Sequence, residues 1–69
     1  MKYFVHIKLA EDATLWQNEA LELSHCPAVG DSISFTANGP VYRVVDVLHN
    51  YFECDYPVEI YAVLTQETH

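Results

Sequence analysis

The chain has 69 residues, which gives room for one small domain spanning 1–69 and for no second one. Hydrophobic residues make up 51% of it and charged residues 19%, a composition too apolar for a disordered chain. Ten acidic side chains against three basic ones give a net charge of -7, and such a surface repels the phosphate backbone of nucleic acids. We therefore expect a folded, acidic protein without direct contact to DNA or RNA.

The sequence also argues against a membrane protein. None of its apolar runs approaches the roughly 18 residues that a membrane-spanning helix needs. The N-terminal segment carries His6 and Lys8 where a signal peptide would need an apolar core, so we expect a cytoplasmic location and no membrane partner. In that compartment, Cys26 and Cys54 are expected to be reduced thiols that pack within the fold. Small domains have limited cores, so a homodimer is a further expectation.

The first segment has the pattern of a half-buried β-strand, because apolar residues recur at every second position. One face should enter the core, with the side chains of Tyr3, Val5, Ile7 and Leu9. The other face carries Phe4, His6 and two lysines, and we expect His6 to be solvated there.

The polar residues that follow leave two interpretations open. Residues 12–19 either belong to a hairpin or form one short helical turn with Asp12 as its N-cap. We favour the hairpin, since Leu21 and Leu23 flank Glu22 as they would in a second strand.

Proline and glycine mark the next turn of the chain, over residues 26–31. Pro27 fixes its own φ, and Gly30 can adopt the positive φ that a tight turn often requires. Ile33 and Phe35 then alternate with serines, which predicts a short strand.

The Asn-Gly dipeptide at 38–39 is a strong hairpin signal and predicts a reversal into a strand over 42–48, with the strands on its two sides paired. Two apolar pairs interrupt the alternation within that strand, which predicts a bulge near Val45 or Asp46. A last strand over 58–64 places its even-numbered side chains on one face and completes the sheet.

Five short strands at intervals of about ten residues predict an all-β fold, a five-stranded, strongly bent antiparallel sheet or a small barrel. One series of turn and apolar residues resembles the SH3-like barrels: Pro27, Val29, Gly30, Asp31, Ile33, Tyr42, Val44, Val47 and His49. In those barrels a Val-Gly-Asp turn leads into a hairpin whose second strand is bent. The sequence also looks like many short bacterial and phage proteins. The resemblance covers residues 20–64 and brings no catalytic residues with it.

Neither a metal site nor a catalytic site is indicated. His25 with Cys26, and His49 with Cys54, are the obvious zinc ligands, but structural zinc sites generally use two closely spaced pairs. Neighbours in a strand point to opposite faces, so His25 and Cys26 would not both face one ion. A nucleophilic pair of Cys54 and His49 would lack an oriented third group and a substrate cavity. We expect no metal, no cofactor and no enzymatic activity.

The segment 50–57 is the most informative part of the sequence. It joins two predicted strands, yet aromatic and acidic side chains alternate in it: Tyr51, Phe52, Glu53, Asp55 and Tyr56. Aromatic residues are favoured anchors of protein interfaces, and carboxylates select a basic partner. These five residues and Trp16 are therefore the predicted partner-binding residues. The alternative is that Tyr51, Phe52 or Trp16 folds back as a lid on a small core.

The leading hypothesis is a non-enzymatic, acidic protein-binding module that engages a basic site on a nucleic-acid-handling complex. Small phage inhibitors of host defence systems, anti-CRISPR proteins among them, are similar in size and charge but share no motif with the chain. One alternative is a structural subunit of a homo-oligomer that uses strand edges or outward-facing Phe4, Tyr61 and Val63. Another is an SH3-like nucleic-acid-binding domain, for which the chain carries too little positive charge.

Overall fold

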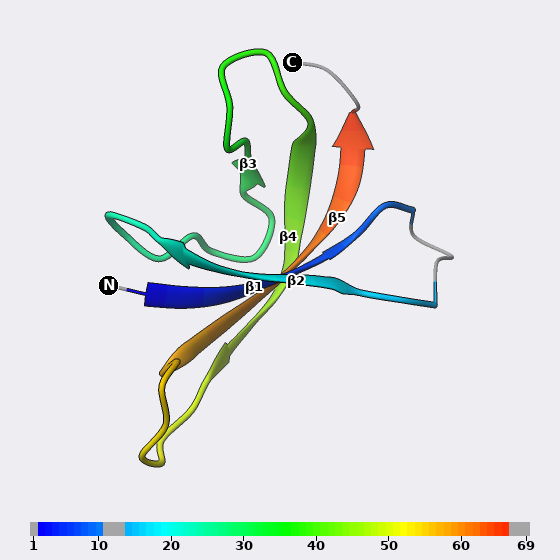
Figure 1. The fold of residues 1–69 in the computed structure, drawn as a ribbon. Helices are drawn as coiled ribbons and strands as arrows, with labels where there is room; N and C mark the ends of the chain where they lie inside the picture. Colours follow the sequence, from blue (N-terminus) through cyan, green and yellow to red (C-terminus); the bar gives the residue numbers. More distant parts are fainter. Residues whose placement is uncertain (1, 11–13, 67–69) are drawn as a thin grey trace.

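The structure, a computed structural model, describes residues 2–10 and 14–66. These residues form five β-strands and no helix, so the predicted all-β class is confirmed (Figure 1). The strands are β1 (Lys2–Lys8), β2 (Gln17–Glu22), β3 (Ser32–Ile33), β4 (Val41–His49) and β5 (Val58–Gln66). A helix long and apolar enough to cross a membrane is absent from the described residues.

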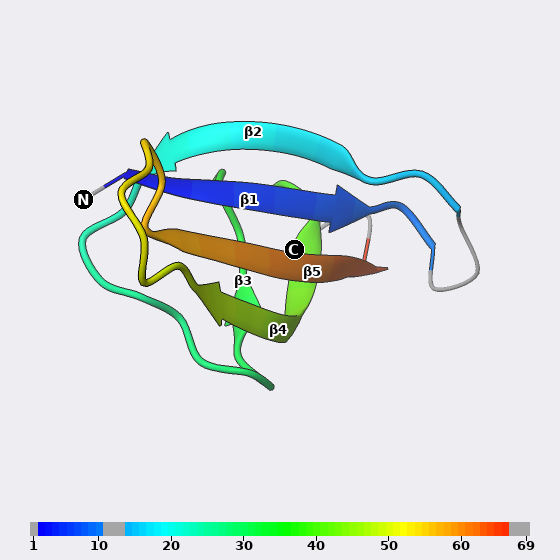
Figure 2. The same cartoon turned by 90° about the horizontal axis from the view of Figure 1, so that it is seen from below.

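The five strands form one strongly curled sheet in the order β2-β1-β5-β4-β3, with β2 and β3 at its described edges. Figure 2 shows β2, β1, β5 and β4 side by side as they bend into a half-barrel. The pairs β1–β2, β3–β4 and β4–β5 are antiparallel, whereas β1 and β5 run parallel. The sheet is therefore mixed, and the wholly antiparallel sheet that we expected is wrong in this detail. Turn signals predict that consecutive strands pair antiparallel, but they do not predict how the first and last strands of the chain pair.

β1 and β2 form the hairpin that the sequence favoured over a helical turn. Residues 11–13, which include the predicted N-cap of the alternative helix, lie outside the described residues. Residues 14–16 have no regular structure, and the second strand begins at Gln17. In the hairpin register, His6 lies opposite Asn18, which places both side chains on the same face of the sheet.

The turn between β2 and β3 is the one that the sequence predicted. Gly30 has a φ of 96°, in the region that favours glycine. The N–H of Asp31 donates to the carbonyl of Ala28 at 3.0 Å, and the N–H of Ala28 donates to Oδ2 of Asp31 at 2.9 Å. The N–H of Gly30 also donates to the carbonyl of Val44 at 2.8 Å, which ties the turn to β4.

The second reversal is wider than the Asn-Gly dipeptide predicts, and β3 covers only Ser32–Ile33. Neither Asn38 nor Gly39 has the positive φ that a two-residue hairpin turn requires. The hydroxyl of Ser34 lies 3.0 Å from the carbonyl of Pro40 and holds the wider loop closed. The reversal is therefore confirmed, and β3 and β4 pair across it as expected, although it is not a two-residue turn.

A bulge interrupts the pairing of β4 with β5 at the predicted place. Val44 lies opposite Ala62 and Asp46 lies opposite Tyr61, so Val45 is the extra residue. Bulges bend a strand and increase its twist, which fits the strong curl of this sheet.

The inner face of the curled sheet holds the hydrophobic core, whose buried side chains are Tyr3, Val5, Ile7, Val44, Val58 and Ile60. The alternation in the first and last strands is thereby confirmed, except that Leu9 lies beyond the end of β1 and is exposed. Cys26 and Cys54 are free and exposed, so the expectation that they pack within the fold is wrong. Both lie in connecting segments and not in strands.

Candidate functional site

The outer face of the sheet is not the solvated surface that the alternation in β1 predicts. His6 is buried there, with 9% of its surface exposed, and the expectation of a solvated histidine is wrong. Side chains from β2 and β5 cover its ring. The alternation of apolar and polar residues within β1 does not predict which side chains of other strands lie over it.

Five rings form a continuous series across this face, in the order Tyr56, Phe4, His6, Tyr61 and Trp16. Neighbouring ring centroids lie between 4.4 and 5.2 Å apart, in alternating stacked and edge-on contacts. Nζ of Lys8 lies 4.6 Å from the centroid of Trp16, a cation–π contact at the end of the series. Both geometries are favourable for aromatic pairs, so the rings stabilise the outer face much as a second small core would.

The sequence suggested a homo-oligomer contact through side chains on this face, but the ring series leaves little of the face free for it. Phe4 and Tyr61 are only half-buried, but each contacts two rings of the series. Val63 is buried, so it does not point outward into solvent as expected.

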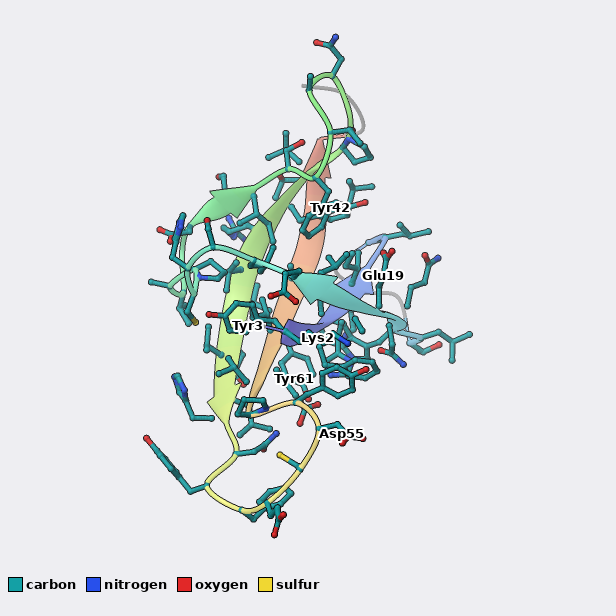
Figure 3. All side chains as sticks on the ribbon, turned by 60° about the vertical axis from the view of Figure 1, so that its left-hand side comes forward. Lys2, Tyr3, Glu19, Tyr42, Asp55 and Tyr61 are labelled. Atoms are coloured by element: carbon teal, nitrogen blue, oxygen red, sulfur yellow. The ribbon has the colours of Figure 1, made fainter. Side chains whose placement is uncertain are left out.

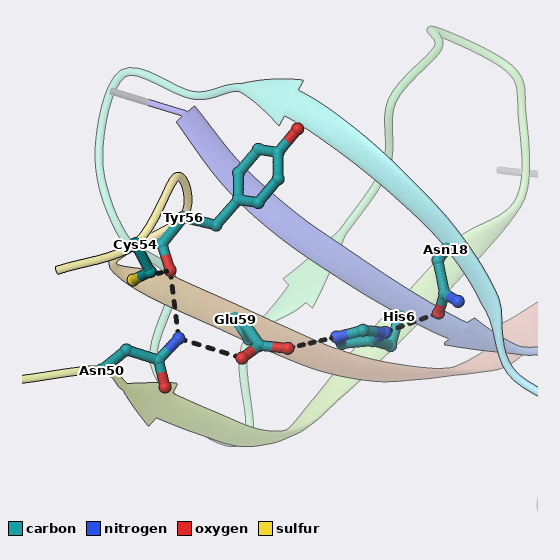
Figure 4. Close-up of polar contacts among 6 residues, drawn as sticks. All are labelled: His6, Asn18, Asn50, Cys54, Tyr56 and Glu59. Carbon is teal, nitrogen blue, oxygen red and sulfur yellow. Dashed lines mark hydrogen bonds and ion pairs between the residues drawn. The ribbon is translucent and has the colours of Figure 1, made fainter. Parts of the chain in front are cut away.

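A line of hydrogen bonds crosses the same face (Figure 4). Oδ1 of Asn18 lies 2.5 Å from Nδ1 of His6, and Nε2 of His6 lies 2.8 Å from Oε1 of Glu59. The second carboxylate oxygen of Glu59, Oε2, accepts from Nδ2 of Asn50 at 2.9 Å. The line therefore joins β2, β1 and β5 to the residue that follows β4.

The carboxyl group of Glu59 is held in its ionised form by these donors. Its pKa is lowered from the ordinary value, first because Asn50 donates to it and second because His6 does. Burial acts in the opposite direction without outweighing the two hydrogen bonds. The pKa of Tyr61 is raised, mainly by burial and then by the carboxylates of Glu59 and Asp46, so this ring stays neutral.

Asn50 also closes the base of the loop 50–57. Its backbone N–H donates to the carbonyl of Pro57 at 2.8 Å, and its Nδ2 donates to the carbonyl of Tyr56 at 3.0 Å. Sγ of Cys54 donates to the same carbonyl at 3.2 Å. Since Tyr56 is in turn stacked in the ring series, the end of the loop next to β5 is fixed by both its backbone and its side chain.

The tip of this loop presents two aromatic rings to solvent. Tyr51 is 96% exposed and Phe52 is 68% exposed, so neither ring is a lid on the core. Glu53 and Asp55, in the same loop, are exposed as well. Figure 3 shows the loop projecting from the end of the sheet, with Asp55 on the side of the loop and not at its far end.

The six predicted partner-binding residues thus fall into two groups. Four of them are exposed side chains of the loop 50–57: Tyr51, Phe52, Glu53 and Asp55. Tyr56 and Trp16 are half-buried at the two opposite ends of the ring series, so Trp16 does not share the surface of the tip. We refer below to the first four residues as the loop tip.

The structure gives no support to the other sites that the sequence raised. In the ranges 2–10 and 14–66, no three side chains of His, Cys, Asp or Glu gather as metal ligands would. Cys54 donates to the carbonyl of Tyr56, and the ring of His49 stacks at 6.5 Å on that of Tyr51, so each has a partner outside the suggested nucleophilic pair.

A pocket of about 270 Å³ lies between the segment that follows β2 and the strand β3. Its lining is Leu23, Ser24, His25, Pro27, Ser32, Ile33, Ser34 and Phe35. Most small-molecule sites have volumes of roughly 300–1,000 Å³, so this pocket is small for a substrate.

Comparison with known proteins finds no family model, no curated protein and no solved structure that matches the chain significantly. Its function therefore has to follow from the geometry and charge of its own residues. The sequence pattern singled out the residues of the loop tip as a candidate site, but it did not indicate the polar line formed by four other residues: His6, Asn18, Asn50 and Glu59. Asn50, which directly follows a strand, is the one visible signal among the four, because asparagine often hydrogen-bonds to nearby backbone at such positions.

Proposed function

We propose that the protein is a non-enzymatic binding module that uses its loop tip to engage a basic surface of another protein. The observation that carries this proposal is the exposure of Tyr51 and Phe52 on a loop whose base is fixed by Asn50. Exposed aromatic groups are typical anchors of protein interfaces. A loop that is already ordered loses less conformational entropy when it binds, which favours affinity.

The charge of the tip defines the partner. Glu53 and Asp55 are exposed in the same loop as the two rings and would pair with lysine or arginine side chains. The same cations gain further energy by lying over an aromatic ring. The net charge of -7 would also accelerate the encounter with a basic protein and disfavour nucleic acid as the direct ligand.

We extend the proposal to the fold family and the setting. The curled five-stranded sheet, with its Gly30 turn and bulged β4, supports a relationship to SH3-like barrels, although the parallel β1–β5 pair departs from the antiparallel sheet expected. In the cytoplasm, such a module would cover a basic site of a nucleic-acid-handling complex. Its size and charge are those of small phage-type inhibitors, including anti-CRISPR proteins.

A structural subunit of a homodimer is the second candidate, and one observation favours it. β2 is an edge strand in the described sheet and is exposed along most of its length, so a second copy has backbone groups to pair with. Glu19 and Glu22 place negative charge on this edge, and self-pairing would bring like charges together. Light scattering over a range of concentrations tests this candidate, and a monomer at all concentrations would exclude it.

Affinity purification of the tagged protein from its native lysate at two salt concentrations, followed by mass spectrometry, tests the binding proposal. We expect a stoichiometric partner whose recovery falls at high salt, because charge pairs at the surface are screened. Glu53→Lys should abolish capture, whereas Glu19→Lys, the same charge reversal at an exposed position on β2, should not. Equal capture by the two variants would remove the loop tip from consideration.

A further inference from the structure

Glu59 occupies the junction between the sheet and the loop that carries the proposed binding site. One of its oxygens accepts from the buried imidazole of His6 at 2.8 Å, and the other accepts from Asn50 at 2.9 Å (Figure 4). We propose that Glu59 is a positioning residue for the loop tip and acts on it through Asn50. This inference rests on the proposed function, because it assigns the residue that sets the geometry of that same site.

The side chain of Asn50 can fix the loop only if its amide is held in one orientation. Both hydrogens of Nδ2 are used, one toward Oε2 of Glu59 and one toward the carbonyl of Tyr56. An ionised carboxylate can only accept, so it excludes the flipped amide, whose oxygen would face Oε2. The carboxylate of Glu59 and the carbonyl of Tyr56 both require this orientation, and the charge of Glu59 makes its hydrogen bond to Asn50 the stronger of the two. Asn50 in turn holds the base of the loop.

Glu59 is itself well placed to act as a fixed point. Nε2 of His6 donates to it, and the His6 ring is held by Asn18 and lies stacked on Tyr61 at 4.4 Å. A carboxylate that accepts from a buried ring has less freedom than one in solvent, and its hydrogen bonds are stronger than neutral ones. Through Glu59, the base of the loop is therefore linked to His6, a buried polar side chain of the outer face.

Other charged groups near this junction have different contacts. Asp46 on β4 lies opposite Tyr61, but its Oδ1 accepts from the backbone N–H of Val47 at 2.9 Å. Lys8 on β1 lies over the ring of Trp16 at the far end of the ring series. Among these groups, only Glu59 has a hydrogen bond to the loop base in the described residues.

A simpler alternative is that Glu59 serves only to satisfy the buried His6 and so stabilises the sheet. The structure offers a matched control for that role, because His6 has two side-chain partners and only one of them reaches the loop. Asn18→Ala removes the partner that does not reach it. Glu59→Gln removes the charge of the partner that does, and it replaces one of the two accepting oxygens by an NH2 group, which can only donate.

Backbone hydrogen exchange at Asn50, followed by NMR, measures the loop base without any partner. The N–H of Asn50 closes the loop onto Pro57, so it reports opening directly. We expect exchange about tenfold faster in Glu59→Gln and within about twofold of wild type in Asn18→Ala, as the loss of a charge-assisted bond implies. Unchanged exchange in Glu59→Gln, or equal acceleration in both variants, would overturn the inference.

Should Glu59→Gln fail to fold, as judged by its circular dichroism, Asn50→Ala takes its place. That variant removes the side-chain arm to the loop and keeps the hydrogen bond between His6 and Glu59. Exchange of the backbone N–H at position 50 should again rise about tenfold, with the ring signals of His6 unchanged. Unchanged exchange would overturn the inference here as well.

Binding to the captured partner separates this inference from the function on which it rests. If exchange rises and Glu59→Gln weakens binding about fivefold, with Asn18→Ala binding as wild type, the positioning role stands. If Glu53→Lys abolishes binding while exchange is unchanged in Glu59→Gln, the inference alone fails. If exchange rises but neither Glu59→Gln nor Glu53→Lys affects binding, Glu59 orders the loop but the tip is not the binding site, and the proposed function fails.

Discussion

The imidazole of His6 and the carboxylate of Glu59 form a 2.8 Å hydrogen bond between strands from opposite ends of the chain. In the parallel register, Glu59 lies opposite Phe4 and His6 lies opposite Tyr61, so the contact runs diagonally across the two strands. It belongs to a face on which, among the described residues, every buried side-chain nitrogen and oxygen has a hydrogen-bond partner. Buried polar groups without partners are costly, so this network stabilises the pairing of β1 with β5.

The first prediction concerns stability in acid. The pKa of Glu59 lies below its ordinary value of 4.5, so the folded state favours the ionised form more than the unfolded chain does. This contribution is complete above pH 4.5 and is lost as the pH falls through the lower pKa of the folded state. We expect Glu59→Gln to be less stable than wild type at neutral pH and to lose less stability on acidification.

Thermal unfolding followed by circular dichroism from neutral pH down to about pH 3 measures this difference, because the carboxylates titrate in that range. Glu53→Gln is the matched control, since it removes one charge from an exposed carboxylate of the loop that is not a member of the line from Asn18 to Asn50. Its stability profile should follow that of wild type. A Glu59→Gln profile that runs parallel to wild type would show that the network does not depend on the ionised carboxylate.

The second prediction concerns the turn at Gly30. Its φ of 96° is costly for a residue with a Cβ, although open space surrounds the position where that atom would lie. Gly30→Ala should therefore lower the free energy of unfolding by about 1–2 kcal/mol through backbone strain alone. Urea unfolding gives this value, and an unchanged midpoint would show that the turn can adopt another conformation.

Sequence alone predicts this turn, the bulge at Val45 and the core faces of β1 and β5, because each depends on residues close together in the chain. The glycine predicts the turn, the interrupted alternation predicts the bulge, and the regular alternation predicts the core faces. The loop tip is likewise visible, since aromatic and acidic residues stand in a connector between two strong strand patterns.

The burial of His6 is beyond such local signals. Its ring is covered by Asn18, Glu59 and Tyr61. Glu59 and Tyr61 lie on β5, and no turn signal in the sequence predicts that β5 pairs in parallel with β1. The alternation within one strand predicts that a polar residue on its outer face is exposed to solvent, and only the neighbouring strands show whether it is covered. For the same reason, the hydrogen bond that ties Glu59 to Asn50 is not predictable from the sequence.

The third prediction contrasts the inner core with the loop tip. Ile60 is fully buried at 0% exposure, so Ile60→Val should cost about 0.5–1.5 kcal/mol of unfolding free energy. Tyr51→Ala removes a much larger side chain, yet it should change stability by less than about 0.5 kcal/mol because the ring is exposed. Chemical unfolding of both variants provides the measurement. A larger loss for Tyr51→Ala than for Ile60→Val would mean that this ring packs on the fold.

The last prediction tests the rings of the loop tip as anchors. Tyr51→Ala and Phe52→Ala should each weaken binding to the captured partner about tenfold, since an aromatic anchor typically contributes more than about 1 kcal/mol. Leu15→Ala is the matched control, because Leu15 is also a large, exposed apolar residue but lies in the connection between β1 and β2. Isothermal titration at two salt concentrations provides the measurement. The ring variants should lose affinity at both concentrations. Glu53→Lys should lose affinity mainly at low salt, because charge pairing is least screened there. Comparable losses in Leu15→Ala would mean that apolar surface in general drives the interaction, and the tip would then have no special part in it.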